Sequence, residues 1–130
     1  MKYFYAIMHK GEDSAYGVTF PDFPGCFSAA DNEEDVLPNA SHALELWLDD
    51  QPVVEPSQLD HVRAVAAEEI MAGGTLIGVP YIRNDHRVVR VNLSIERGIL
   101  EAIDKAAAER RLTRSAFLAQ AARNEILGTR

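Results

Sequence analysis

The residues best suited to bind an anionic partner are arginines near the C-terminus of the sequence. Residues 86–130 hold 9 Lys+Arg, of which 8 are Arg. Arg is preferred where phosphates or base edges are gripped, because its guanidinium is a planar fork of donors. One of these arginines, Arg90, shares the polar side of an alternating segment with Asn92 and Ser94. This part of the chain is therefore the first candidate for chemistry, and the chemistry is anion binding.

Carboxylates in the first part of the chain are the residues that a metal-dependent nuclease would need. Such a reaction requires several carboxylates that converge on two metal ions. The acids available are Asp22, Asp31, Glu34 and Asp35. Asp22 lies in a proline-flanked turn, and the other three open a predicted helix, where capping explains them. We therefore expect no catalytic residue and no metal site.

The composition is that of an ordinary soluble domain, with 130 residues, 47% hydrophobic and 25% charged. The sequence has no run of about 18 apolar residues and no small-residue cleavage site after its opening residues. We therefore expect neither a membrane span nor an export signal. The single Cys26 cannot form an internal disulfide or a structural zinc site, and it is interpreted as a small buried hydrophobe. A cytoplasmic protein without a cofactor is the expectation.

Charge divides the chain into two parts. Residues 1–85 carry 4 Lys+Arg against 15 Asp+Glu, or -11, whereas residues 86–130 carry 9 against 5, or +4. Such asymmetry bears on association rather than on fold. We expect two partners, and we place the domain boundary in the polar connector, which gives domains 1–84 and 85–130.

Hydrophobic periodicity predicts a sheet with helices in the first domain. The segment from Lys2 to His9 is apolar on both alternating faces, as in a strand buried on both sides. Short connections favour antiparallel pairing with the next strands. Strands are expected at 2–9, 14–20, 26–30 and 75–82. Helices are expected over about 31–50, opened by acidic caps, and after a cap at Ser57 as far as the Gly73-Gly74 stop.

Prolines mark two local features of this domain. In the segment FPDFPG they forbid a central strand, and Pro24-Gly25 fits the centre of a tight turn. Phe23 is then either presented at a rim or plugs the core, and both interpretations stay open. Pro38 disrupts a helix beyond its first turn, so the helix is expected to begin near Leu37.

The second domain is predicted to run strand, helix, helix. A strand over 88–95 leads into a helix over about 96–110, and Thr113 caps a further helix that ends near residue 127. So small a module buries too little surface to fold alone, and its single strand needs a partner. Two chains that pair their strands above a shared helical core solve both problems. The residues expected in this dimer core are Val91, Leu93, Leu100, Ile103, Phe117 and Ile126.

The segment VVRVNLSIERGILEAIDKAAAERRLTRSAFLAQAA resembles the ribbon-helix-helix module of Arc and MetJ type repressors. The resemblance covers residues 88–127 and implies that two paired strands enter the DNA major groove. It further implies that the outward residues Arg90, Asn92 and Ser94 read base edges. Arg suits guanine and Asn suits adenine, so two of the three residue types fit that role.

The same resemblance implies a phosphate site at the start of the second helix. There the family anchors DNA phosphates on backbone amides, and the matching residues are Thr113, Arg114 and Ser115. Many members carry a glycine in the preceding turn, where this chain has Arg111-Leu112.

The first 82 residues are similar to HicB antitoxins of bacterial toxin-antitoxin systems. The similarity is carried by the strand-turn-strand opening, the stretch FPDFPGCFSAADNEED and the helix HALELWLDD. It implies a partial RNase H-like fold and a basic, HicA-like ribonuclease toxin as partner, which an acidic domain would complement. HicB proteins end in a helix-turn-helix or a ribbon-helix-helix, so the two resemblances agree. The toxin-binding candidates are Phe23, Asp31, Glu33, Glu34 and Asp35.

The sequence thus predicts a non-enzymatic α+β antitoxin with an RNase H-like first domain and a ribbon-helix-helix second domain. It would occlude a HicA-like toxin and repress its own operon as a homodimer or tetramer on double-stranded operator DNA. Two other functions stay open, namely a ligand-sensing repressor without a toxin and a metal-dependent nuclease. The second domain could also dimerise without touching DNA.

Overall fold

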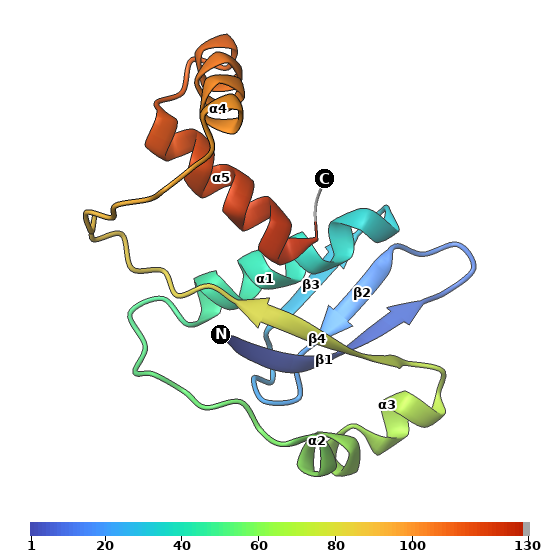
Figure 1. Ribbon diagram of the computed structural model, residues 1–130. Helices are drawn as coiled ribbons and strands as arrows, with labels where there is room; N and C mark the ends of the chain where they lie inside the picture. The colour runs from blue at the N-terminus through green and yellow to red at the C-terminus, as the bar shows by residue number, and fades with distance from the viewer. Residues whose placement is uncertain (129–130) are drawn as a thin grey trace. The chain divides into compact units, whose positions relative to one another are not determined.

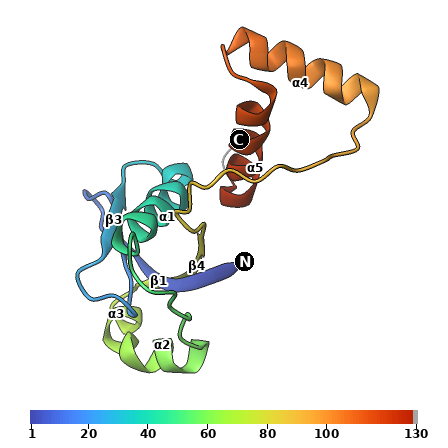
Figure 2. The same cartoon turned by 90° about the vertical axis from the view of Figure 1, so that its left-hand side faces the viewer.

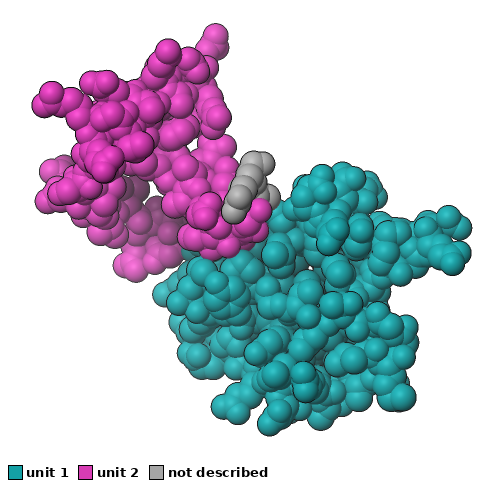
Figure 3. Space-filling view, turned by 45° about the vertical axis from the view of Figure 1, so that its right-hand side comes forward, with its two compact units in different colours: residues 1–84, 129 teal, residues 85–128, 130 magenta. Residues whose placement is uncertain are grey.

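The computed structural model describes residues 1–128, which form two compact units, residues 1–84 and 85–128 (Figure 3). The first unit contains β1 (Lys2–Lys10), β2 (Tyr16–Thr19), β3 (Phe27–Ala30), the 3₁₀ turn η1 (Glu33–Asp35), α1 (Val36–Trp47), α2 (Leu59–Val65), α3 (Ala67–Met71) and β4 (Thr75–Tyr81). The second unit contains α4 (Arg97–Glu109) and α5 (Arg114–Leu127). The predicted α+β class is confirmed. Within residues 1–128, every helix is too short or too polar to cross a membrane.

The sheet of the first unit has four antiparallel strands in the order β3-β2-β1-β4 (Figure 1). The long β1 is central, with α1 on one face of the sheet and α2 and α3 on the other (Figure 2). Phe4 and Ala6 are fully buried in the core beneath α1, and Ile7 is fully buried on the opposite face. The prediction that this strand is buried on both sides is therefore confirmed.

A buried hydroxyl ties α1 to the edge strand β4. The Ser41 side chain is fully buried, and its Oγ donates a 2.9 Å hydrogen bond to the carbonyl oxygen of Pro80. Ser41 lies on the same buried stripe of α1 as Ala40 and Leu44. The helix packs against the sheet through this stripe, so the hydroxyl fixes its position along β4.

The helix α1 is shorter than the range 31–50, and it begins close to the start near Leu37 that Pro38 predicts. A 3₁₀ turn precedes it, and α1 begins at Val36, so Pro38 falls in its first turn. An N–H there would have no intrahelical acceptor, and the proline costs no hydrogen bond. The predicted side-chain cap is wrong, because neither N-cap residue, Asn32 for η1 or Asp35 for α1, makes a side-chain capping hydrogen bond. The predicted first-turn carboxylates are present, but they lie in the 3₁₀ turn η1.

The second predicted helix is divided in two at Ala66, and its predicted cap is wrong. The N-cap of α2 is Gln58, without a side-chain hydrogen bond. Ser57 instead donates its backbone N–H to Oδ2 of Asp22 at 3.0 Å. Asp22 thus joins the turn after β2 to the segment before α2, which gives this carboxylate a structural role.

The predicted stop at Gly73-Gly74 is confirmed. Gly73 has φ 102°, and the N–H of Gly74 bonds to the carbonyl of Glu69 at 2.9 Å, as in a Schellman motif. A Cβ on Gly74 would lie 2.5 Å from Cγ2 of Ile7. The second glycine is therefore required because the chain passes close to β1.

Candidate nucleic-acid and protein-binding surfaces

The strand predicted over 88–95 is absent from the chain as it stands. Residues 82–96 form neither helix nor strand. Val88 is 97% exposed, Val91 67% and Leu93 65%. A strand is defined by hydrogen bonds to a neighbour, and within residues 1–128 none pairs with this segment. The apolar side of the alternation therefore lies open to solvent, together with the polar side.

The predicted base-reading residues lie on this open segment. Arg90, Asn92 and Ser94 are all exposed. In the part of the chain that the structure describes, none of the three has a hydrogen bond or ion pair. Their side chains are therefore available to an external partner.

The helices of the second unit form a hairpin that lacks a closed core. Ala107 is buried at the helix-helix contact, with 3% of its surface exposed. Leu100, Ile103 and Phe117 are only half-buried, and Ile126 is 42% exposed. Of the six residues predicted for the dimer core, Val91, Leu93 and Ile126 are thus exposed in one chain, and the other three are only partly covered.

The turn between α4 and α5 has the geometry that a glycine usually supplies. Arg111 has φ 57°, and its N–H bonds to the carbonyl of Ala108 at 3.1 Å. The N–H of Leu112 bonds to the carbonyl of Ala107 at 2.8 Å, which completes a Schellman motif. The departure from glycine at this turn therefore leaves the left-handed backbone conformation in place.

The start of α5 is capped as the sequence predicts. Oγ1 of Thr113 accepts a hydrogen bond from the N–H of Ala116 at 3.1 Å. The N–H groups of Arg114 and Ser115 belong to the first turn and have no acceptor within the helix. Because the dipole of a helix favours anions at this end, these two amide N–H groups can donate hydrogen bonds to a phosphate oxygen.

The Arg114 side chain is held by a residue that sequence reasoning missed. Its Nε and Nη2 donate to Oδ1 and Oδ2 of Asp104, both at 2.8 Å, so α5 is joined to α4 by a two-pronged ion pair. These two hydrogen bonds lower the pKa of the Asp104 carboxyl group and raise the pKa of the Arg114 guanidinium. Beside this pair, the Arg110 guanidinium lies 5.5 Å from the Phe117 ring centroid. Asp104 and Arg114 lie ten residues apart, so only the hairpin geometry brings them together.

The Phe23 turn is built as predicted, and its ring packs on the core. The N–H of Cys26 bonds to the carbonyl of Phe23 at 2.9 Å, and Gly25 has φ 98°, as a type II turn needs. The ring centroid of Phe23 lies 5.2 Å from that of Phe4 and 6.5 Å from that of Trp47. Of the two interpretations of Phe23, packing in the core fits this geometry better. Burial also raises the pKa of the Cys26 thiol.

An aromatic side chain that the sequence analysis overlooked lies exposed nearby. Phe27 is 73% exposed and stands on β3, an edge strand of the sheet. Register places it opposite Thr19, which is itself opposite Ile7, so the three share one face of the sheet. Helix α3 reaches Thr19, whose Oγ1 donates to Oε2 of Glu69 at 2.9 Å. Phe27 is one strand further out and is left uncovered.

The acidic candidates follow β3 directly. Asp31, Glu33, Glu34 and Asp35 are all exposed. Two cations of the first unit are already engaged, since Nζ of Lys2 lies 2.7 Å from Oε1 of Glu55 and that of Lys10 lies 5.5 Å from the Tyr16 ring centroid. Among residues 1–128, none of the carboxylates after β3 forms an ion pair, so they leave an exposed negative segment at the end of the strand that begins with Phe27.

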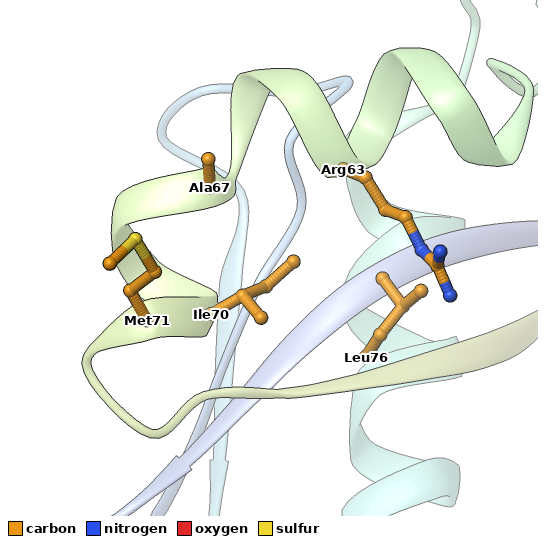
Figure 4. Close-up of a pocket in the computed structure, with 5 residues that line it drawn as sticks. All are labelled: Arg63, Ala67, Ile70, Met71 and Leu76. Carbon is orange, nitrogen blue, oxygen red and sulfur yellow. The ribbon is translucent and has the colours of Figure 1, made fainter.

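Two features bear on the other functions considered. Among residues 1–128, no group of three or more His, Cys, Asp or Glu side chains gathers closely enough to hold a metal ion. An open cavity of about 370 Å³ lies between α2, α3 and β4 (Figure 4), lined by Arg63, Ala67, Ile70, Met71 and Leu76. Its single charged group is the Arg63 guanidinium, so it contains no acid, base or nucleophile for catalysis.

Comparison with known proteins gives consistent results. The family described as HicB_like antitoxin of bacterial toxin-antitoxin system matches residues 4–122. The crystal structure of the Burkholderia pseudomallei antitoxin HicB is 33% identical, with a TM-score of 0.54, and the match covers 94% of this chain and 96% of that one. The antitoxin HicB3 crystal structure is 28% identical, with a TM-score of 0.54, over 95% and 97% of the two chains. An uncharacterised 14.9 kDa protein of Haemophilus phage HP1 is 25% identical over 95% of this chain and 97% of its own length.

The elements and surfaces define an α+β protein in which an acidic sheet unit is followed by an arginine-rich helical hairpin. The family match and the similarity to solved antitoxins cover nearly all of it. The chain belongs to the HicB-like antitoxin family of bacterial toxin-antitoxin systems.

Proposed function

We propose that this antitoxin occludes a HicA-like ribonuclease toxin with residues 1–84 and represses its own operon with residues 85–130. The proposed repressor function rests on the exposure of the segment 88–95. It exposes Val91 and Leu93 on one side of the alternation and unpartnered Arg90, Asn92 and Ser94 on the other. A second copy that pairs with this segment would cover the first set, and operator DNA would engage the second.

The homodimer follows from the same residues. Burying apolar surface contributes about 25 cal/mol per Å², and a hairpin that leaves Leu100, Ile103 and Phe117 partly exposed gains only part of this contribution alone. Packing two hairpins together would cover these residues and Ile126. Phosphates would bind the amides at the start of α5, around Thr113, Arg114 and Ser115, and so fix the register on DNA without reading sequence.

The toxin surface is proposed at the outer end of the sheet. Phe27 supplies an exposed aromatic ring, and Asp31, Glu33, Glu34 and Asp35 supply the negative rim. Aromatic anchors with a charged surround are typical of protein interfaces, and the rim would steer a basic partner. Phe23 is then a packing residue of the core and not part of this surface.

The test uses the full chain and a basic ribonuclease toxin encoded beside it. The antitoxin should co-purify with the toxin, restore growth to cells that express it, and shift DNA from its own promoter. Phe27→Ser should weaken toxin binding by about 1 to 2 kcal/mol with little loss of stability, because the ring is already exposed. Changing Glu33 and Glu34 to Lys should weaken it further.

Changing Glu12 and Asp13 to Lys is the matched control, since it makes the same charge change at the exposed β1–β2 turn. If this control inhibits toxin binding as strongly as the change at Glu33 and Glu34, net charge alone explains the effect and the proposed toxin surface is wrong.

A ligand-sensing repressor is the second candidate, and the cavity beside Arg63 is the observation that favours it. Cavities of about 300 to 1,000 Å³ lined by apolar side chains are the usual size for small ligands. If operator affinity changes with a small anionic metabolite and no toxin co-purifies, this second function replaces the first.

A further inference from the structure

Arg114 binds Asp104 through only one edge of its guanidinium. That edge consists of Nε and Nη2, each with a 2.8 Å hydrogen bond to a different carboxylate oxygen. A guanidinium carries five N–H donors, so the Nη1 group and one hydrogen of Nη2 are not used by this pair. The Arg114 side chain is still 54% exposed and that of Asp104 45%. The unused edge can therefore be reached by a ligand.

We propose that Asp104 is a positioning residue for DNA binding, which holds the Arg114 guanidinium so that its free edge receives a backbone phosphate. This inference rests on the proposed function, because it assigns a second contact to the same phosphate site. The phosphate would lie between the free edge of Arg114 and the first-turn amides of α5. Asp104 itself touches no DNA.

The benefit of such a partner is preorganisation. A free arginine side chain loses much of its rotamer freedom when it binds a phosphate, and a fork already fixed by a carboxylate has lost it beforehand. The pair also joins α4 to α5, because Asp104 lies on α4 and Arg114 is the first residue of α5. The side chain and the helix terminus that would share one phosphate are thus fixed together.

Simple electrostatics predicts the opposite sign for the same residue. A carboxylate close to DNA repels phosphates, so its removal should tighten binding. If the Asp104 carboxylate only competes with DNA phosphates for the Arg114 guanidinium, its removal should tighten DNA binding still more. The direction of the change on removing Asp104 therefore separates positioning from repulsion and from competition.

The experiment measures binding of the full chain to promoter DNA and to an unrelated duplex over a range of salt concentrations. Asp104→Asn should weaken binding to both duplexes by about two- to fivefold, the range of an exposed ion pair. Glu101→Gln is the matched control, because Glu101 is an exposed acid of α4 without a bond to Arg114. It should leave binding unchanged or slightly tighter.

A double-mutant cycle shows whether Asp104 acts through Arg114. Arg114→Ala should make the slope of log K against log salt shallower by about 0.9. In that background Asp104→Asn should no longer weaken binding. Arg114→Lys provides a second variant that keeps the charge, and it should weaken binding as Asp104→Asn does, since an ammonium cannot bind both groups as a rigid fork.

The failures are distinguishable. If Asp104→Asn tightens DNA binding, the positioning role is wrong. The same holds if Asp104→Asn weakens binding as much in the Arg114→Ala background as in the wild-type chain. In both cases the DNA-binding function stands. A wild-type chain that binds no DNA overturns both the proposed function and this inference.

Discussion

The N–H of Leu112 donates a 2.8 Å hydrogen bond to the carbonyl of Ala107, and this bond closes the turn that separates α4 from α5. The residue that makes the closure possible is Arg111, with φ 57°. A left-handed conformation costs an L-residue about 1 to 2 kcal/mol relative to glycine. The second unit therefore has strain at the turn that precedes its proposed phosphate site.

Arg111→Gly should leave the second unit equally stable or more stable, by up to about 1 kcal/mol. The relief of strain exceeds the extra chain entropy that glycine adds to the unfolded state. Arg110→Gly is the control, because Arg110 has φ -96° and gains nothing from glycine. It should lower the melting temperature at the same protein concentration, and a lower melting temperature for Arg111→Gly would contradict the argument.

Ser41→Ala should destabilise the first unit by about 1 to 3 kcal/mol. The substitution leaves the buried carbonyl of Pro80 without its donor, and little room exists for a replacement water, since Ser41 is fully buried. The denaturant midpoint of the full chain reports this loss. Ser57→Ala should have little effect, because Ser57 uses its backbone N–H rather than its side chain.

Local patterns predicted the elements of the first unit well, and tertiary context decided the rest. The two-sided apolar pattern of β1, the Pro24-Gly25 turn and the Gly73-Gly74 stop are all present. The caps were wrong because capping depends on where the first turn begins. The predicted cap residue Ser57 is used by Asp22 from a distant loop, and no local signal indicates that contact.

The candidate surfaces were predictable only in part for a similar reason. Alternation alone predicts that Arg90 and Asn92 are exposed, and they are, but Val91 and Leu93 on the other side of the pattern are exposed as well. Phe27 was missed because its exposure depends on strand register and on where α3 stops covering the sheet. Asp104 was missed because its partner lies across a helical hairpin. The segment 88–95 forms no strand within residues 1–128, because a strand needs hydrogen bonds to a neighbouring strand as well as an alternating pattern.

Arg90→Ala should weaken binding to promoter DNA by about 1 to 3 kcal/mol, as expected for loss of a bidentate base contact. Binding to unrelated DNA should change less, because a base reader adds little to non-specific affinity. Gel shifts with both duplexes at one salt concentration measure the difference. Unchanged affinity and specificity would show that this segment does not read bases.

Leu93→Asp should abolish dimerisation and DNA binding together. Leu93 is 65% exposed in one chain, so a charge there costs little in the monomer. In the proposed dimer the same carboxylate would be buried without a partner, which is strongly unfavourable. Sedimentation should therefore show a monomer and gel shifts should show no DNA complex, while the first unit stays folded. An intact dimer with DNA bound would rule out this segment as the dimer core.

The two proposed functions should separate at the connector. A fragment of residues 1–84 contains the whole sheet and the buried core around Phe4, Leu44 and Val79, so it should fold alone. It should bind a basic toxin more weakly than the full chain, because it lacks the avidity of a dimer, and it should not bind DNA. Co-expression with the toxin measures this directly, with the Phe27→Ser fragment as control. If growth is restored only when residues 85–130 are also present, toxin inhibition does not reside in the first unit.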